Sequence, residues 1–159
     1  MGGRAPAASG RLTGATVAVA ALALASLSAC GAQAPGPPEI VVDRSACSHC
    51  RMFISEPVYA AAYQAPDAEA RVFDDIACLL AAARAETGPL RYWVHDAADG
   101  EWIDGDTAVL VRSPEIRTPM AGGIIAFRTR AAADAAAARH HGRVVPSLQA
   151  LLAEEGERR

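Results

Sequence analysis

One arrangement of strands, turns and a capped helix occurs twice in this sequence, and it restricts the fold more than any other feature. In each copy, two short apolar strands precede a helix that begins after a capping side chain, and a third strand follows a turn. The first copy is predicted at 58–64, 70–73, 76–86 and 91–95, and the second at 107–112, 123–127, 130–141 and 143–145. This repetition predicts an α+β fold, with two tandem strand-strand-helix-strand units forming one small domain.

The helix boundaries follow from capping residues. Asp74 or Asp75 is placed to cap the helix at 76–86, and Thr129 to cap the helix at 130–141. The segment 96–106 is rich in Asp and Gly, so we expect a hinge-like connection between the two units. Residues 147–155 predict a short amphipathic helix at the end of the chain.

The first 29 residues are typical of an export signal. Arg4 and Arg11 give a positively charged start, and a short apolar run follows at 16–26. The run ends in Leu27-Ser28-Ala29-Cys30, which resembles the lipobox of bacterial lipoproteins. We therefore predict cleavage before Cys30, lipidation of Cys30 and a flexible tether over 30–38. The alternative is an ordinary signal peptide with a cysteine close to its end.

The predicted domain at 39–159 has no composition that suggests nucleic-acid binding. All 15 basic residues of the chain are arginines, two of them lie in the signal, and acidic residues number 18. The exported part is therefore acidic, with no basic stripe that could follow a phosphate backbone.

The chemistry of the sequence is concentrated at Cys47-Ser48-His49-Cys50-Arg51-Met52. Two thiols separated by two residues can bind one metal ion from a single turn, and Met52 adds a thioether from the same loop. Thiolate and thioether are soft donors, which favour Cu(I). A structural zinc site lacks its further cysteine or histidine pair.

Other interpretations of the loop stay open. An exported Cys-x-x-Cys pair is also typical of a structural disulfide, or of the redox pair of a thiol–disulfide oxidoreductase. Cys78 lies in an apolar stretch and is predicted to be a buried core residue. His49 is a possible further ligand. The sequence shows no nucleophile–His–acid pattern and no phosphate-binding glycine loop, so it does not predict an enzyme.

The order of several motifs resembles the nitrous-oxide reductase accessory lipoprotein (NosL) family. The resemblance rests on the lipobox, the Cys-x-x-Cys-x-Met loop, and the segments Val72-Phe73-Asp74-Asp75, Tyr92-Trp93-Val94, Trp102-Ile103-Asp104, Pro119-Met120 and Ile124-Ile125-Ala126-Phe127. It implies a periplasmic or other extracytoplasmic Cu(I) chaperone, lipid-anchored to the cell membrane, that supplies copper to the copper-sulfide centre of nitrous-oxide reductase in denitrification.

The resemblance also implies a set of metal ligands. Cys47, Cys50 and Met52 match the metal-binding loop of the family, and Met120 matches a methionine that would complete the coordination from the second unit. Arg51 stands where the family usually has glycine, and Thr118 and Ala121 replace glycines around Met120. These departures leave open a cuproenzyme client other than nitrous-oxide reductase.

Overall fold

The structure is a computed structural model that describes residues 1–3 and 36–157. The chain divides into two units, Met1–Pro35 and Gly36–Arg159, and the fold described below is that of the second unit. Most of the predicted export signal, and Cys30 with it, lies outside the described residues.

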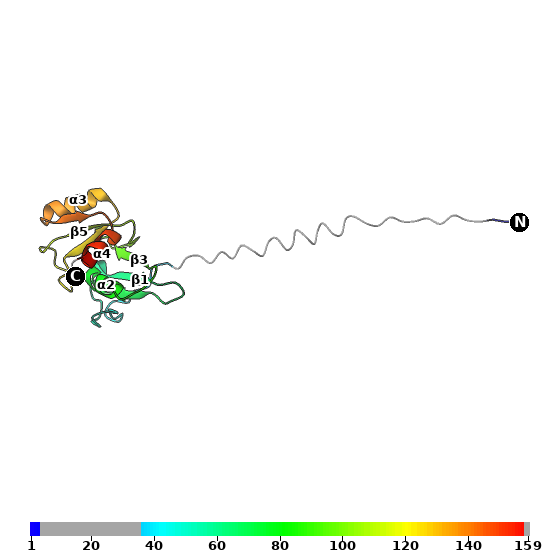
Figure 1. The fold of residues 1–159 in the computed structure, drawn as a ribbon, viewed down its shortest axis with the longest axis horizontal. Helices are drawn as coiled ribbons and strands as arrows, with labels where there is room; N and C mark the ends of the chain where they lie inside the picture. Colours follow the sequence, from blue (N-terminus) through cyan, green and yellow to red (C-terminus); the bar gives the residue numbers. More distant parts are fainter. Residues whose placement is uncertain (4–35, 158–159) are drawn as a thin grey trace. The chain divides into compact units, whose positions relative to one another are not determined.

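The first repeat forms a four-stranded antiparallel sheet in the order β2-β1-β3-β4. A short 3₁₀ turn, η2, precedes β1, and Pro57 begins this turn because its fixed φ suits a first helical position. Helix α2 follows β2 and packs against β1 and β2 (Figure 1). The elements are η2 (Pro57–Tyr59), β1 (Ala61–Gln64), β2 (Arg71–Phe73), α2 (Ile76–Ala83), β3 (Arg91–His95) and β4 (Trp102–Asp104).

The second repeat forms a three-stranded antiparallel sheet in the order β6-β5-β7. In both repeats the first strand is therefore central, and the helix connects the two strands that flank it. Helix α3 packs on all three strands of this sheet. The elements are β5 (Val109–Arg112), β6 (Ile124–Phe127), α3 (Arg130–Arg139) and β7 (Arg143–Val145), followed by the terminal helix α4 (Leu148–Glu157).

The α+β class and the two repeated units predicted from the sequence are confirmed, and two segments differ. The strand expected at 58–64 begins at Ala61, because Pro57–Tyr59 form the 3₁₀ turn η2. The hinge-like connection expected at 96–106 contains β4, which pairs antiparallel with β3. The Asp and Gly residues belong to two tight turns on either side of β4. In the first turn Gly100 N–H donates to the Asp96 carbonyl, and in the second Asp106 N–H donates to the Asp104 side chain. Such turns use the same residues as a linker would.

The larger of two apolar clusters joins the two repeats. Its buried side chains come from the first sheet, from α2 and α4, and from one face of the second sheet, including Leu110 and Val145. β6 alternates, because Ile124 and Ala126 belong to this cluster while Ile125 and Phe127 pack with α3 on the opposite face. The second sheet is therefore covered on both faces.

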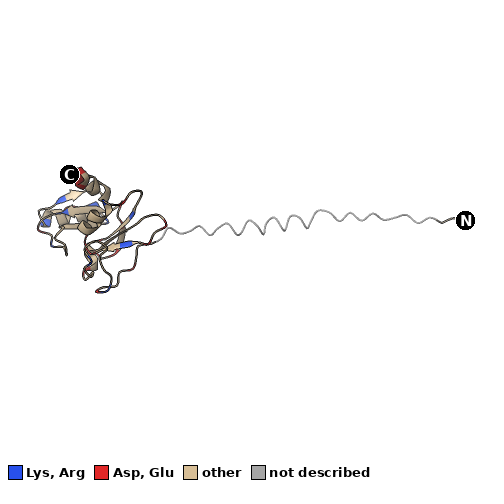
Figure 2. Cartoon of the chain, turned by 60° about the horizontal axis from the view of Figure 1, so that its bottom comes forward, with Lys and Arg blue, Asp and Glu red and all other residues tan. Residues whose placement is uncertain are grey.

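Helix α4 connects the two repeats through charge as well as packing. Acidic residues cluster at its C-terminal end (Figure 2). Glu155 accepts from Arg84, which follows α2, and from Arg112 of β5, with N–O distances of 2.6 Å in both pairs. Within the described residues, no helix has the length and apolar character needed to cross a membrane.

Candidate metal centre

The Cys47–Met52 segment forms a closed turn. Cys47 N–H donates to the Met52 carbonyl (2.8 Å), and Arg51 N–H donates to the Cys47 carbonyl (3.0 Å). Arg51 has a φ of 68°, the left-handed conformation that favours glycine. Ser48 N–H donates to the Val72 carbonyl of β2 (2.8 Å), and this bond holds the turn against the first sheet.

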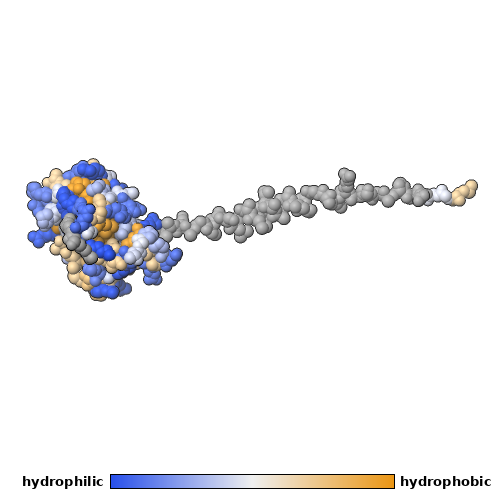
Figure 3. Space-filling view, viewed as in Figure 1, coloured by the Kyte–Doolittle hydropathy of each residue, from blue (hydrophilic) through white to orange (hydrophobic). Residues whose placement is uncertain are grey.

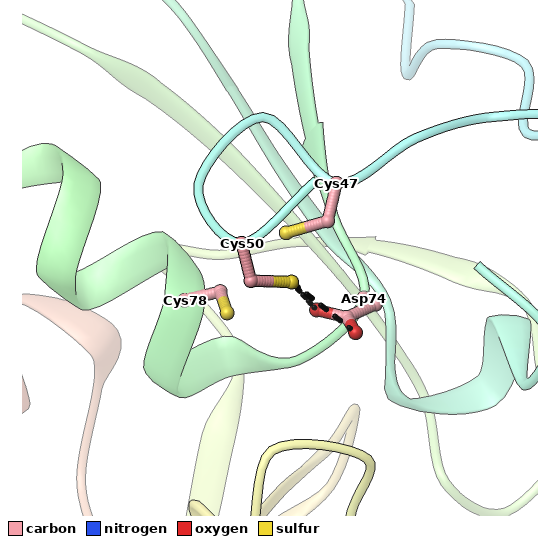
Figure 4. A group of neighbouring side chains, drawn as sticks. All are labelled: Cys47, Cys50, Asp74 and Cys78. Atoms are coloured by element: carbon pink, nitrogen blue, oxygen red, sulfur yellow. Dashed lines mark hydrogen bonds between the residues drawn. The ribbon is translucent and has the colours of Figure 1, made fainter. Parts of the chain in front are cut away.

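Four possible ligands meet beside this turn. The Sγ atoms of Cys47, Cys50 and Cys78 and a carboxylate oxygen of Asp74 all lie within 4.8 Å of one another. Cys47, Cys78 and Asp74 are buried, whereas Cys50 is half-buried. Figure 4 shows the two loop cysteines above the start of α2, with Cys78 on the helix and Asp74 just before it. The cluster therefore joins the turn to the first turn of α2.

Hydrogen bonding and burial decide the charge of the thiols. Cys50 Sγ donates to Asp74 Oδ1 and Oδ2 at 3.7 and 3.8 Å. Burial raises the pKa of the Cys50 thiol, and the neighbouring Cys47 and Asp74 raise it further, although a backbone hydrogen bond with Met52 opposes them. Burial is also the largest cause that raises the pKa of Cys78. Without a cation these two thiols are protonated, and a bound metal ion would stabilise their thiolates.

Asp75 links the same helix start to the loop that contains Met120. One carboxylate oxygen caps α2 by accepting from Ala77 N–H (2.6 Å), as the sequence predicts. The other accepts from the Thr118 hydroxyl and from Met120 N–H (3.1 Å). Gly122 packs closely on this helix turn, because an added Cβ would lie 2.5 Å from that of Ala77 and 2.7 Å from Asp75 Oδ1.

The expected ligands fall into two groups. Cys47 and Cys50 are brought together, as their spacing predicts. Met52 and Met120 are 53% and 38% exposed, and the backbone of Met120 bonds to Asp75 before α2. His49 is exposed on the loop. The assignment of Met52 and Met120 as ligands stays a prediction.

Cys78 and Asp74 are the two members of the cluster that sequence reasoning missed. Cys78 was assigned to the apolar core, and it is buried there, but its sulfur also faces the other two thiols. The sequence predicts Asp74 or Asp75 as the capping residue of the helix, and Asp75 takes that role. The doublet contained a signal, because one carboxylate suffices as a cap and leaves the second available for another role.

Much of the exposed apolar surface lies near this site. Val41, Val42, Met52 and Phe53 are exposed large apolar residues within the segment that contains the cysteine turn. Apolar side chains also reach the surface among hydrophilic ones on the face shown in Figure 3. Exposed apolar residues gathered beside a candidate site are typical of a surface that another protein contacts.

Comparison with known proteins agrees with the family suggested by the motifs. The NosL family model matches residues 38–150. Among solved structures, the copper chaperone NosL from Shewanella denitrificans superposes with a TM-score of 0.58 at 15% identity, covering 70% of this chain and 93% of that one. No curated protein matches the chain. The structural likeness shows a shared fold, and the family match spans both repeats and the cysteine turn: this chain belongs to the NosL family.

Proposed function

We propose that this protein is an extracytoplasmic Cu(I) chaperone, which binds the ion at Cys47 and Cys50 and delivers it to a cuproenzyme. The observation that carries the proposal is the meeting of three cysteine sulfurs and one carboxylate within 4.8 Å, beside exposed methionine. Sulfur-rich donor sets select soft Cu(I). The solved NosL that shares the fold is described as a copper chaperone.

Partial exposure suits delivery rather than storage. Cys50 is half-buried and Met52 is exposed, so an acceptor's ligand could reach the ion from solvent. We expect the thioethers of Met52 and Met120 to add to the two thiolates during this exchange. The proposed role is binding and transfer, with no bond of a substrate made or broken.

An anaerobic Cu(I) titration tests the proposal. The reduced domain Gly36–Arg159, a compact unit distinct from residues 1–35, competes with a colorimetric Cu(I) chelator. We expect one equivalent of copper to be extracted, with extraction abolished in the double variant Cys47→Ser, Cys50→Ser and weakened in Met52→Leu. Undiminished copper retention by the double variant would refute the proposed site.

The thiol–disulfide oxidoreductase interpretation receives no support from the site. A reactive redox thiol is solvent-accessible and has a lowered pKa, but Cys47 is fully buried and burial raises the pKa of Cys50. An insulin-reduction assay of the reduced domain is expected to show no turnover, and measurable catalysis would revive this interpretation.

We further propose that the client is nitrous-oxide reductase and that lipidated Cys30 anchors the protein to the membrane. The family match supports the first proposal, and the lipobox supports the second. A strain that lacks this protein is expected to make nitrous-oxide reductase without its copper-sulfide centre, and a plasmid copy of the gene should restore the centre with sulfide that the cell supplies. Wild-type protein should fractionate with membranes, and Cys30→Ser should lose that association.

A further inference from the structure

Cys78 is placed unlike an ordinary core cysteine. It lies in the first turn of α2, three residues after the capping Asp75, and its side chain is buried. A buried free cysteine normally packs as a small apolar group. Here the Sγ atom instead lies within 4.8 Å of two other sulfurs and a carboxylate oxygen (Figure 4).

We infer that Cys78 is a third sulfur ligand of the Cu(I) cargo, so that Cys47, Cys50 and Cys78 hold the ion in a three-thiolate site closed on its protein side. The inference rests on the proposed copper function and adds a ligand from the first helix to those expected from the loop. Cu(I) accepts three sulfur ligands, and the three thiolates are the strongest donors at this site.

The separations between the donor atoms allow this arrangement. A metal–thiolate bond is about 2.3 Å, so three sulfurs arranged trigonally around one ion lie about 4.0 Å apart. The observed upper limit of 4.8 Å exceeds that separation by about 0.8 Å, so each sulfur has to move by less than 1 Å toward a central ion. Closing the site around an ion therefore requires a small side-chain adjustment and no rearrangement of α2.

Asp74 has a different part in this arrangement. Its carboxylate is a hard donor, which Cu(I) does not prefer over sulfur. Both of its oxygens accept a hydrogen bond from Cys50 Sγ, at 3.7 and 3.8 Å, and the Asp74 side chain is buried. Asp74 therefore acts as a positioning residue that orients the one half-exposed cysteine toward the two buried ones.

The test uses the reduced domain Gly36–Arg159 with Cu(I) as the only added ligand. Two quantities are measured for wild type and for each variant: the Cu(I) affinity and the intensity of the thiolate-to-copper absorption band in the ultraviolet. Cys78→Ala, with a small apolar side chain suited to the core, should weaken binding on the order of tenfold or more. Its band should fall by about one third, since one of three thiolates is lost. Met52→Leu should leave the band intensity unchanged, because a thioether contributes no thiolate.

The control is Ala82→Ser, which alters another buried position of α2 and leaves all four donor groups in place. Circular dichroism establishes that each variant is folded. If wild type binds Cu(I) and Cys78→Ala keeps the affinity and the full band, the inference is overturned while the proposed function stands. If wild type itself binds no Cu(I), the proposed function fails, and the inference with it.

Discussion

Arg51 adopts a backbone conformation that its side chain disfavours. Its φ of 68° closes the cysteine turn, and the NosL resemblance places glycine at this position. A non-glycine residue in the left-handed region costs about 1–2 kcal/mol. The turn therefore keeps the path that glycine would permit and bears the strain of an arginine.

Arg51→Gly should relieve this strain. The gain is partly offset because glycine makes the unfolded chain more flexible, so we expect the free energy of unfolding to rise by up to about 1 kcal/mol. Urea denaturation of the metal-free domain measures the change. The control His49→Gly changes the same turn where φ is not positive, and should cost about 0.4–1 kcal/mol. Equal destabilisation by both substitutions would contradict the argument.

His95 is a buried titratable residue outside the metal centre. Its Nδ1–H donates to the Gly100 carbonyl at 2.7 Å, and its ring lies 3.8 Å from that of Trp102 between centroids. Nε2 is buried and has no hydrogen-bond partner among the described residues. Burial is the main cause that lowers the pKa of His95 below its usual value of 6.5.

The lowered pKa gives stability a pH dependence. Near and below pH 6.5 the His95 side chain is protonated in the unfolded chain but stays neutral in the folded protein, because its pKa is lower there. The free energy of unfolding should therefore fall as pH decreases from about 7 to 5. His95→Phe keeps an aromatic ring beside Trp102 and removes the titration. Urea denaturation at several pH values should give a shallower decline for this variant, and identical declines would exclude His95 as the source.

Elements were easier to predict from the sequence than the contacts between them. The capping residues Asp75 and Thr129 correctly mark the starts of α2 and α3, because a cap acts within one turn of chain. β4 was missed, since a three-residue strand between two Asp/Gly turns has too few residues to show a period. Its pairing with β3 is what defines it.

The candidate site also has a part that could be predicted from local sequence and a part that depends on contacts between elements. Cys47 and Cys50 could be paired from their spacing, which is a local property. Cys78 joins them through the docking of the turn on β2, where Ser48 bonds to Val72, and through the packing of α2 on that sheet. Neither contact leaves a periodic pattern in the sequence, so the third sulfur could not be predicted.

The close packing of the Met120 loop on α2 gives a prediction at the scale of elements. Gly122→Ala would place a Cβ against Ala77 and Asp75, which should lower the free energy of unfolding by about 1–3 kcal/mol and displace the loop from the helix. Gly156→Ala in α4 is the control, because nothing lies within 4 Å of its added Cβ. Urea denaturation compares the two, and a Gly122→Ala variant as stable as wild type would show that the loop adjusts freely.

At the scale of the whole domain, the two repeats share one core, and α4 helps to close it. Leu148 and Leu151 of this helix are fully buried in the cluster that both sheets line. Glu155 adds ion pairs to both repeats, but partly exposed ion pairs contribute little. Apolar packing should therefore dominate the contribution of α4.

A pair of substitutions in α4 tests this ranking. Leu151→Ala should reduce the free energy of unfolding by about 2–5 kcal/mol, because it leaves a cavity in the shared core. Glu155→Gln should cost about 1 kcal/mol or less. Both repeats should unfold together in either variant, in one transition followed by circular dichroism and tryptophan fluorescence. A larger loss in Glu155→Gln than in Leu151→Ala would reverse the ranking.

Two neighbouring carboxylates at the start of α2 face different parts of the molecule. Asp74 contacts the thiol of Cys50, while Asp75 receives the backbone of Met120 from the second repeat. One peptide unit thus lies between the cysteine site and the methionine loop. A displacement of the Met120 loop would therefore reach Cys50 through a single peptide unit, which couples the loop and the cysteine turn mechanically.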